Sequence, residues 1–263
     1  MEVNKNYNEP CIETMSTMPD CFVSGIITSP PYNMGSNPNH RSINEGDLNL
    51  YNDKEVDNLS TEEYLDIRLK EFVQFDRILK NDGVICYNIS YSSDSPILPT
   101  LLISDVHNKT NLTLADIISW KKRTAHPFQT SPNKLTRLVE LVYVFVHKDC
   151  QQNFKANKEV SKKNEKTNQL FYKNYTNLLD APNNDGQDIG LYACFSSLFV
   201  RKLINIYFPK DSLIYDPFMG SGTTAVGCII DGIDFIGSEI NTSFFLKSNK
   251  LIKDTKIQFK LDF

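Results

Sequence analysis

A Ser-Pro-Pro-Tyr sequence at residues 29–32 directly follows an apolar segment with the composition of a buried strand. The two prolines restrict the backbone, so the Ser29 side chain and neighbouring carbonyl groups are expected to project rigidly from the strand end. Acceptors held in this way can bind an exocyclic NH₂ group and orient its lone pair, while Tyr32 supplies a flat face for a base. The alternative interpretation is a plain proline turn that ends a strand.

A second motif places a glycine-rich turn, Gly220-Ser221-Gly222, between a short apolar strand and a helix. Glycines at such a turn let a ligand approach the backbone beside a helix N-terminus. Glu239 follows near the expected end of the next strand, where an acidic side chain can bind ribose hydroxyl groups. The pattern favours a nucleoside cofactor over a turn without a ligand. A phosphate-binding loop is disfavoured because no Gly-Lys-Ser/Thr follows, and a nicotinamide oxidoreductase because the third glycine misses its fingerprint position.

Strand and helix signals alternate along the chain and predict the elements that position both motifs. Apolar, β-branched or aromatic runs predict strands at residues 20–27, 84–89, 114–120, 139–146, 212–215 and 234–237. Helical spacing of apolar residues predicts helices at residues 61–79, 96–106, 195–207, 225–231 and 242–253, with a turn at 81–83 after the first. Strands separated by helices indicate an α/β fold with a doubly wound parallel sheet.

The two motifs together resemble those of the DNA amino-methyltransferases, the N4-cytosine and N6-adenine enzymes of restriction-modification type. That family carries a [DNS]PP[YF] catalytic motif and a DPFxGSGTT cofactor motif, which stand here at residues 29–32 and 216–224. Residues 77–80, 118–121 and 140–145 are similar to further landmarks of the family. The catalytic motif precedes the cofactor motif, which is the circularly permuted order of the beta class.

The resemblance implies a Rossmann-like class I methyltransferase sheet and S-adenosylmethionine (SAM) as the cofactor. It divides the chain into a catalytic half at residues 1–148, an insert at 149–190 and a cofactor-binding half at 191–263. The target base would be held by Ser29, Pro30, Pro31 and Tyr32, with Asn88 as a further candidate. The cofactor would contact Asp216, Phe218, Gly220, Ser221, Gly222, Thr223, Glu239, Ile240 and Phe195, the last in the helix before the cofactor motif.

The formal net charge of −4 hides a basic segment. Residues 121–175 contain twelve Lys or Arg and four Asp or Glu, on an otherwise acidic chain. Such a segment is either a solvated loop or a surface for phosphates. The insert lies where the resembled family places its target-recognition region, which favours DNA. The predicted phosphate contacts in it are Lys155, Lys158, Lys162 and Lys163.

A polar loop at residues 33–60 lies next to the catalytic motif. Loops of this length in compact domains are often functional. Asn37, His40 and Arg41 make it a candidate to close over a flipped base and contact DNA. For His40 the alternative is a solvent-exposed loop histidine.

Composition excludes several classes of protein. No stretch approaches ~18 consecutive apolar residues, so no membrane span is expected, and the polar N-terminus lacks a signal-peptide apolar region. The six cysteines contain no CxxC pair. This pattern indicates reduced thiols in a cytoplasmic protein and predicts neither a metal site nor a disulfide framework.

Ser29 before the prolines favours N4 of cytosine as the methylated atom, because Asp is commoner there in the N6-adenine enzymes that the chain resembles. N6-adenine methylation of double-stranded DNA is the alternative. More remote alternatives are an RNA or protein N-methyltransferase and a non-catalytic DNA-binding relative. A cognate restriction endonuclease is a possible partner of this class, and the expected state is a monomer or homodimer.

Overall fold

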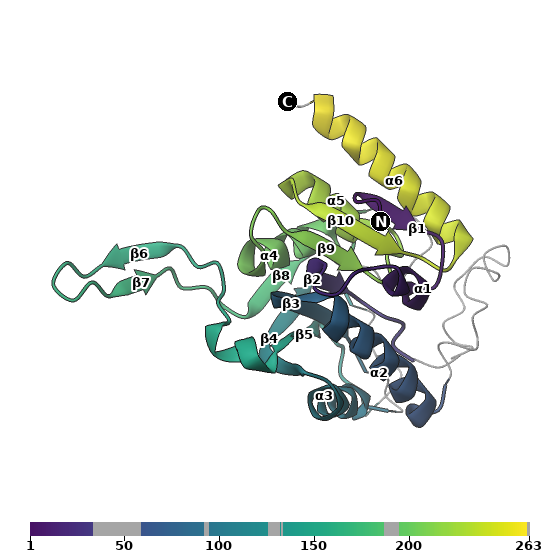
Figure 1. The fold of residues 1–263 in the computed structure, drawn as a ribbon, viewed down its shortest axis with the longest axis horizontal. Helices are drawn as coiled ribbons and strands as arrows, with labels where there is room; N and C mark the ends of the chain where they lie inside the picture. The colour runs from purple at the N-terminus through teal and green to yellow at the C-terminus, as the bar shows by residue number, and fades with distance from the viewer. Residues whose placement is uncertain (34–58, 92–94, 126–131, 133, 187–194, 262–263) are drawn as a thin grey trace.

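The computed structural model describes residues 1–33, 59–91, 95–125, 132, 134–186 and 195–261. Its centre is an eight-stranded sheet in the order β1-β10-β9-β2-β3-β5-β4-β8 (Figure 1). The strands are β1 (Lys5–Tyr7), β2 (Val23–Thr28), β3 (Leu79–Ile89), β4 (Leu112–Lys122), β5 (Val139–His147), β8 (Leu178–Ala181), β9 (Leu213–Asp216) and β10 (Asp234–Ser238). Neighbouring strands pair in parallel except at β5, which runs antiparallel to both β3 and β4.

This sheet confirms the expected α/β class and corrects the expectation that all its strands are parallel. Among the described residues that connect β4 to β5 there is no helix, and adjacent strands joined without a crossover helix pair antiparallel. The edge strands β1 and β8 lie outside the predicted set. β1 is a short, mostly polar strand, and β8 lies within the polar stretch 149–190, so neither follows the apolar pattern that predicted the other strands.

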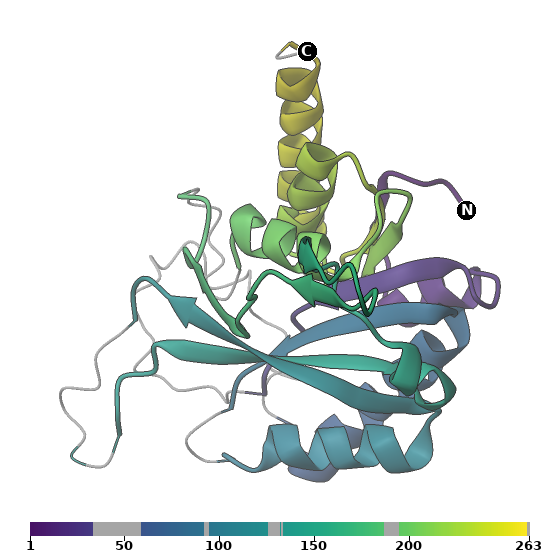
Figure 2. The ribbon, with the colours of Figure 1, turned by 90° about the vertical axis from the view of Figure 1, so that its left-hand side faces the viewer.

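Helices cover both faces of the sheet. α1 (Cys11–Ser16), α2 (Thr61–Ile78) and α3 (Leu98–Lys109) pack on one face, and α4 (Ser197–Tyr207), α5 (Thr223–Asp231) and α6 (Thr242–Leu261) on the other (Figure 2). On the first face Phe72 packs against Tyr87 and Phe145. On the second, Trp120 stacks on Phe199 with ring centroids 4.6 Å apart. The two layers fix the sheet from both sides and so position the loops at its strand ends.

The five predicted helices are present with shifted boundaries, and the shifts of α2 and α4 change the setting of residues named in the sequence. α2 begins at a capping box formed by Ser60 and Glu63 and ends at Ile78. Residues 81–83, expected as a turn after this helix, lie within β3. They form an irregularity in its pairing with β2, between the paired residues Leu79 and Val84. α4 begins at Ser197 behind the capping residue Ser196, so Phe195 precedes the helix and does not lie in it.

The described part of the predicted insert, residues 149–190, contains a separate hairpin and one strand of the main sheet. β6 (Val160–Lys163) and β7 (Leu170–Tyr172) form a separate two-stranded hairpin that projects from the body of the protein (Figure 1). A short 3₁₀ helix, η2 (Lys148–Asn153), precedes the hairpin, and β8 joins the main sheet by pairing with β4. The division of the chain at 149 and 190 stays a prediction.

Candidate active site

The two sequence motifs meet at the carboxyl ends of neighbouring strands. β2 ends at Thr28, immediately before Ser29, and β9 ends at Asp216, the first residue of the cofactor motif. The Thr28 hydroxyl donates to Asp216 Oδ1 at 2.8 Å. The same oxygen accepts from the Phe218 amide at 3.0 Å, and Oδ2 accepts from the Thr224 hydroxyl at 2.5 Å. One carboxylate therefore joins the end of the catalytic strand to the loop and helix of the cofactor motif.

Asp216 is almost fully buried, and burial raises the pKa of its carboxyl to about 6. The hydrogen bonds from Thr224, Thr28 and the Phe218 amide act in the opposite direction, because each stabilises the charged form. Both carboxylate oxygens are engaged by the chain itself. Asp216, predicted to touch the cofactor, is thus placed as the link at the base of the cofactor loop.

Thr28→Val removes one donor of this link with little change in side-chain volume. It is expected to lower the free energy of unfolding by about 1–3 kcal/mol, because a buried carboxylate loses a hydrogen bond. Urea denaturation followed by circular dichroism measures the loss. The matched control is Thr255→Val, which removes a hydroxyl that donates to the Leu251 carbonyl within α6. Equal losses in the two variants would contradict the role of Thr28.

The glycine-rich loop has a conformation that requires glycine. Gly222 has a φ of 88°, a left-handed value that residues with a Cβ rarely adopt. A Cβ at this position would also lie 3.0 Å from the Ser248 Cβ of α6. The backbone of the loop therefore lies close to α6, and its shape depends on the absence of a side chain.

Glu239 follows β10 directly, with its carboxylate against the glycine-rich loop. Its Oε2 accepts from the Gly220 amide and its Oε1 from the Asn241 amide, both at 2.8 Å. Glu239 is 8% exposed, whereas the next residue, Ile240, is 60% exposed. A carboxylate beside a glycine-rich loop, at the carboxyl end of a parallel strand, fits the ribose of a nucleoside cofactor.

The other predicted cofactor residues surround the same loop or adjoin it. Ser221 and Thr223 are buried, with their hydroxyl oxygens 3.5 Å apart, and Phe218 is partly exposed. Phe195 is buried against Phe199, with ring centroids 5.7 Å apart, in a core cluster that also includes residue 219 of the loop. The structure thus brings residues 216–223 and Glu239 together, with Phe195 in the adjoining core.

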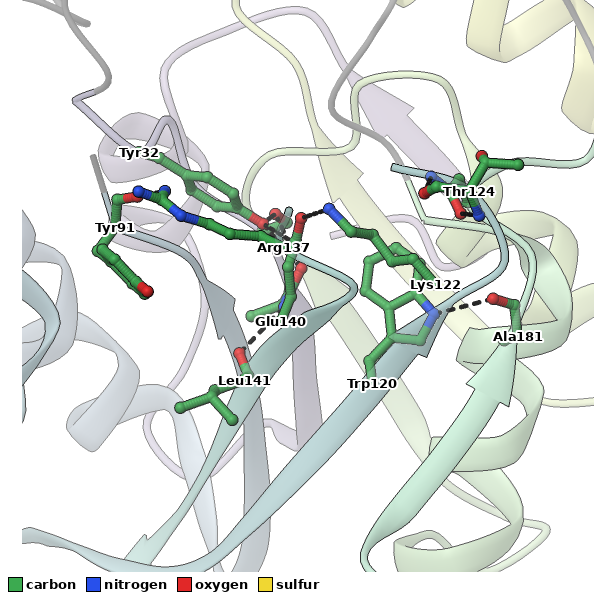
Figure 3. A network of polar contacts seen from close by, with 12 residues as sticks. Tyr32, Tyr91, Trp120, Lys122, Thr124, Arg137, Glu140, Leu141 and Ala181 are labelled. Carbon is green, nitrogen blue, oxygen red and sulfur yellow. Dashed lines mark hydrogen bonds and ion pairs between the residues drawn. The ribbon is translucent and has the colours of Figure 1, made fainter. Parts of the chain in front are cut away.

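The catalytic motif forms a polar cluster at the end of β2, around Tyr32 (Figure 3). The Ser29 hydroxyl lies 2.7 Å from the Tyr32 hydroxyl, which donates to Asn88 Oδ1 at 2.8 Å. The Pro31 carbonyl accepts from the Tyr64 hydroxyl of α2 at 2.7 Å. The structure therefore places Asn88 beside the predicted catalytic residues and holds the two-proline turn against α2.

A partly buried ion pair completes this cluster. Lys122 of β4 and Glu140 of β5 lie 2.5 Å apart, with side chains that are 18% and 14% exposed, and Glu140 Oε2 accepts from Tyr32 at 3.3 Å (Figure 3). The pKa of Tyr32 is raised well above its usual value, mainly by burial and secondly by the negative charge of Glu140. Sequence reasoning gave neither charged residue a role. The available signals were the similarity of residues 140–145 to a family landmark that begins at Glu140, and the charge of Lys122 just after an apolar strand.

A second ion pair, which is fully buried, lies within α2, and its arginine contacts the cofactor loop. Arg68 and Glu71 lie 3.0 Å apart, and the Arg68 guanidinium lies 5.1 Å from the centroid of the Phe218 ring. Burial raises the pKa of Glu71 to about 7, against the opposing effect of the Arg68 charge. Since Tyr64 of the same helix holds Pro31, α2 supports both motifs.

The predicted DNA contacts fall in two regions of the chain. Asn37, His40 and Arg41 lie outside the described residues. Lys162 and Lys163 lie on β6, and Lys155 and Lys158 lie in the segment that leads to it. All four lysines are exposed. They belong to the hairpin and its approach, and they make no contact within the catalytic cluster.

The described part of the chain offers no other obvious catalytic centre. Within it, no group of His, Cys, Asp and Glu is arranged to hold a metal ion, and no helix is long and apolar enough to cross a membrane. The cysteines that the structure describes are unpaired. Burial raises the pKa of Cys11 to about 12, which keeps it in the unreactive thiol form.

Fold and site together define a class I methyltransferase. The glycine-rich loop and Glu239 occupy the ends of β9 and β10, and the proline-fixed polar motif follows the adjacent β2. The family model described as DNA methylase matches residues 23–250. The chain therefore belongs to the N6/N4 DNA methylases, a family of SAM-dependent methyltransferases. This membership confirms the resemblance in the motifs and the expected cofactor.

Solved structures of DNA methyltransferases have the same fold at low sequence identity. The PvuII DNA methyltransferase (cytosine-N4-specific) superposes with a TM-score of 0.70 and 18% identity, covering 97% of this chain and 92% of that chain. M1.HpyAVI in complex with SAM gives a TM-score of 0.56 and 17% identity, covering 94% and 98%. A search of curated sequences found no match. The structural similarity confirms the class I methyltransferase fold.

Proposed function

We propose that this protein transfers a methyl group from SAM to the exocyclic amine of a base in double-stranded DNA, at N4 of cytosine. The observation that carries the proposal is the 2.8 Å bond between Thr28 and Asp216, which joins the Ser-Pro-Pro-Tyr motif to the cofactor loop. A methyl donor on the loop and an amine on the motif would then be neighbours. Holding two reactants in position for attack can lower a barrier by about 7–11 kcal/mol.

The cofactor loop and the end of β10 fit SAM. Glu239 would accept hydrogen bonds from the ribose hydroxyls beside the Gly220 amide, and the exposed Ile240 would lie against the adenine. The methionine end would be lined by Asp216, Phe218, Gly220, Ser221, Gly222 and Thr223, with Phe195 nearby. When bound, SAM supplies an electrophilic methyl group on its sulfonium.

Ser29 and the Pro30 carbonyl would act on the target amine. An exocyclic amine conjugated with its ring is a poor nucleophile, and two fixed acceptors favour the tetrahedral nitrogen whose lone pair is free. The Tyr32 ring would stack on a base flipped out of the duplex, which offsets a flipping cost of roughly a few kcal/mol. Attack in a single displacement requires no covalent bond between the protein and the base.

Ser29 supports cytosine N4 over adenine N6, because Asp is commoner before the prolines in N6-adenine enzymes. The PvuII enzyme, whose fold this chain shares, is described as cytosine-N4-specific. Incubation with SAM and unmodified duplex DNA, digestion to nucleosides and mass spectrometry test the proposal. N4-methylcytosine is the expected product. N6-methyladenine alone would contradict the choice of base, and methylated RNA or protein without methylated DNA would contradict the substrate.

The β6–β7 hairpin is the proposed DNA-contacting arm. Lys162 pairs with Phe171 and Lys163 with Leu170, so the two lysines project from opposite faces of the ribbon. A two-stranded ribbon has a width that the major groove of DNA admits. Lys155 and Lys158, just before the ribbon, would add contacts to phosphates.

Replacing both Lys162 and Lys163 by Gln is expected to weaken DNA binding and to reduce its salt dependence. If both contact phosphates, the slope of log K against log salt concentration falls by about 1.8, because fewer counterions are released. Fluorescence anisotropy with duplex DNA over a range of salt concentrations gives this slope. The matched control replaces Lys250 and Lys253 of α6, which carry the same charge. Equal slopes for the two double variants would show that the hairpin is only a solvated arm.

Further parts of the proposal concern the surroundings of the enzyme. Loop 33–60, with Asn37, His40 and Arg41, is proposed to close over the flipped base. A cognate restriction endonuclease is a proposed partner in the cell, and the cytoplasm is the proposed location. A monomer or homodimer is the proposed state, which sedimentation of the purified chain would determine.

A further inference from the structure

A chain of polar contacts runs from Ser29 through Tyr32 to Glu140 and Lys122. Figure 3 shows the last three of these side chains. The Ser29 and Tyr32 hydroxyl oxygens are 2.7 Å apart, and Tyr32 lies 3.3 Å from Glu140 Oε2. Glu140 Oε1 accepts from Lys122 Nζ at 2.5 Å. Three elements contribute to this chain: the catalytic motif after β2, then β5, then β4. The side chains at its far end, Lys122 and Glu140, are charged and mostly shielded from water.

The direction of the hydrogen bonds in this chain is fixed at Tyr32. Asn88 Nδ2 donates to the Leu141 carbonyl at 3.0 Å, so its amide oxygen faces the Tyr32 hydroxyl. That oxygen and the Glu140 carboxylate can only accept, and together they take the single Tyr32 proton. Burial and the Glu140 charge raise the pKa of Tyr32, which keeps this proton in place at neutral pH.

The direction of the Tyr32 proton determines whether the Ser29 hydroxyl donates or accepts a hydrogen bond from outside the cluster. With its proton directed to Asn88 and Glu140, the Tyr32 oxygen can only accept from Ser29. The Ser29 proton therefore points into the protein, toward Tyr32 at 2.7 Å or Asn88 Oδ1 at 3.5 Å. The remaining lone pairs of Ser29 Oγ are left for a donor outside the cluster, and an exocyclic amine is such a donor.

We propose that Glu140, held by Lys122, is a positioning residue that acts with Asn88 on the Tyr32 hydroxyl and so presents Ser29 to the target amine as an acceptor only. The inference rests on the proposed amine methylation and assigns a role to two residues outside the catalytic motif at 29–32 and the cofactor motif at 216–224. A serine hydroxyl can donate or accept, whereas activation of the amine requires an acceptor. Asn88 and the Glu140 carboxylate together remove this ambiguity, because both accept the Tyr32 proton and leave the Tyr32 oxygen to accept from Ser29.

Glu140→Gln tests this role, because the amide has a similar shape but can donate to the Tyr32 oxygen. It would compete there with the Ser29 proton, while Asn88 Oδ1 still accepts the Tyr32 proton. The single-turnover rate of DNA methylation is expected to fall about 10- to 100-fold, the effect of one hydrogen bond to a charged group. Binding of SAM and DNA should stay within about twofold of the wild type. The matched control is Asp116→Asn on β4, whose carboxylate accepts from the Tyr207 hydroxyl at 3.1 Å, outside the catalytic cluster.

A double-mutant cycle separates this role from a merely structural one. In a Tyr32→Phe background the hydroxyl that connects Glu140 to Ser29 is missing, so Glu140→Gln should change the rate by no more than about twofold. A loss equal to that in the wild-type background would show that Glu140 acts only through packing and would overturn the inference. Unchanged methylation by Glu140→Gln alone would also overturn it. A wild-type protein that methylates no DNA would instead overturn the proposed function.

Discussion

Ser29→Ala is expected to lower the single-turnover rate of DNA methylation by about 100- to 1,000-fold, the typical effect of removing one group that stabilises a transition state. The variant loses the acceptor that would draw the lone pair of the target amine out of conjugation. Because Ser29 lies in the catalytic motif and outside the glycine-rich loop, the affinity for SAM should not change. Rapid-quench transfer of a labelled methyl group measures the rate, and calorimetry measures the affinity.

The control for this variant is Ser104→Ala, on the exposed surface of α3. It makes the same chemical change at a position unrelated to either motif, so its rate should equal that of the wild type. Full methylation by Ser29→Ala would refute the assignment of Ser29. A fall in SAM affinity equal to the fall in rate would show that Ser29 binds the cofactor and not the target amine.

Glu239→Gln is expected to weaken SAM binding by about 10- to 100-fold, because a neutral amide replaces the charged acceptor of the ribose hydroxyls. The loop should loosen as well, since Glu239 Oε2 holds the Gly220 amide at 2.8 Å. Calorimetric titration with SAM measures the affinity. At saturating SAM the rate of methyl transfer should recover most of its wild-type value, since Glu239 does not touch the catalytic motif.

Asp234→Asn is the matched control, because Asp234 lies at the opposite end of the same strand, β10. Its carboxylate accepts from Asn4 at 2.6 Å and is exposed. An unchanged affinity for SAM is expected there. If both variants bound SAM as the wild type does, the carboxylate at the end of β10 would not be the ribose site.

Local patterns predicted most of the elements but not how they are paired. The β-branched and aromatic run of β5 is recognisable in any context, and so is the capping box that starts α2. The antiparallel direction of β5 depends on its two neighbours, which periodicity does not reveal. Likewise, residues 81–83, predicted as a turn, form an irregularity within β3 where its pairing with β2 shifts register.

In the candidate site, too, local sequence motifs could be predicted, whereas contacts between distant segments could not. Motifs that are continuous in sequence, at residues 29–32 and 216–224, could be recognised because each has its own chemistry. Their connection through Thr28 and Asp216 is a contact between residues distant in the chain. The same is true of Glu140 and Lys122, which reach Tyr32 from β5 and β4. Such contacts follow from the strand order β9-β2-β3-β5-β4, which no single segment encodes.

Modification-sensitive sequencing of DNA from cells that express this protein tests the central claim most directly. The wild type and Ser29→Ala are expressed in the same host, which carries no similar methyltransferase, and both genomes are sequenced. We predict that one short sequence carries N4-methylcytosine throughout the wild-type genome and is unmodified with Ser29→Ala. A genome without any modified sequence, or the same modification with both proteins, would contradict the account.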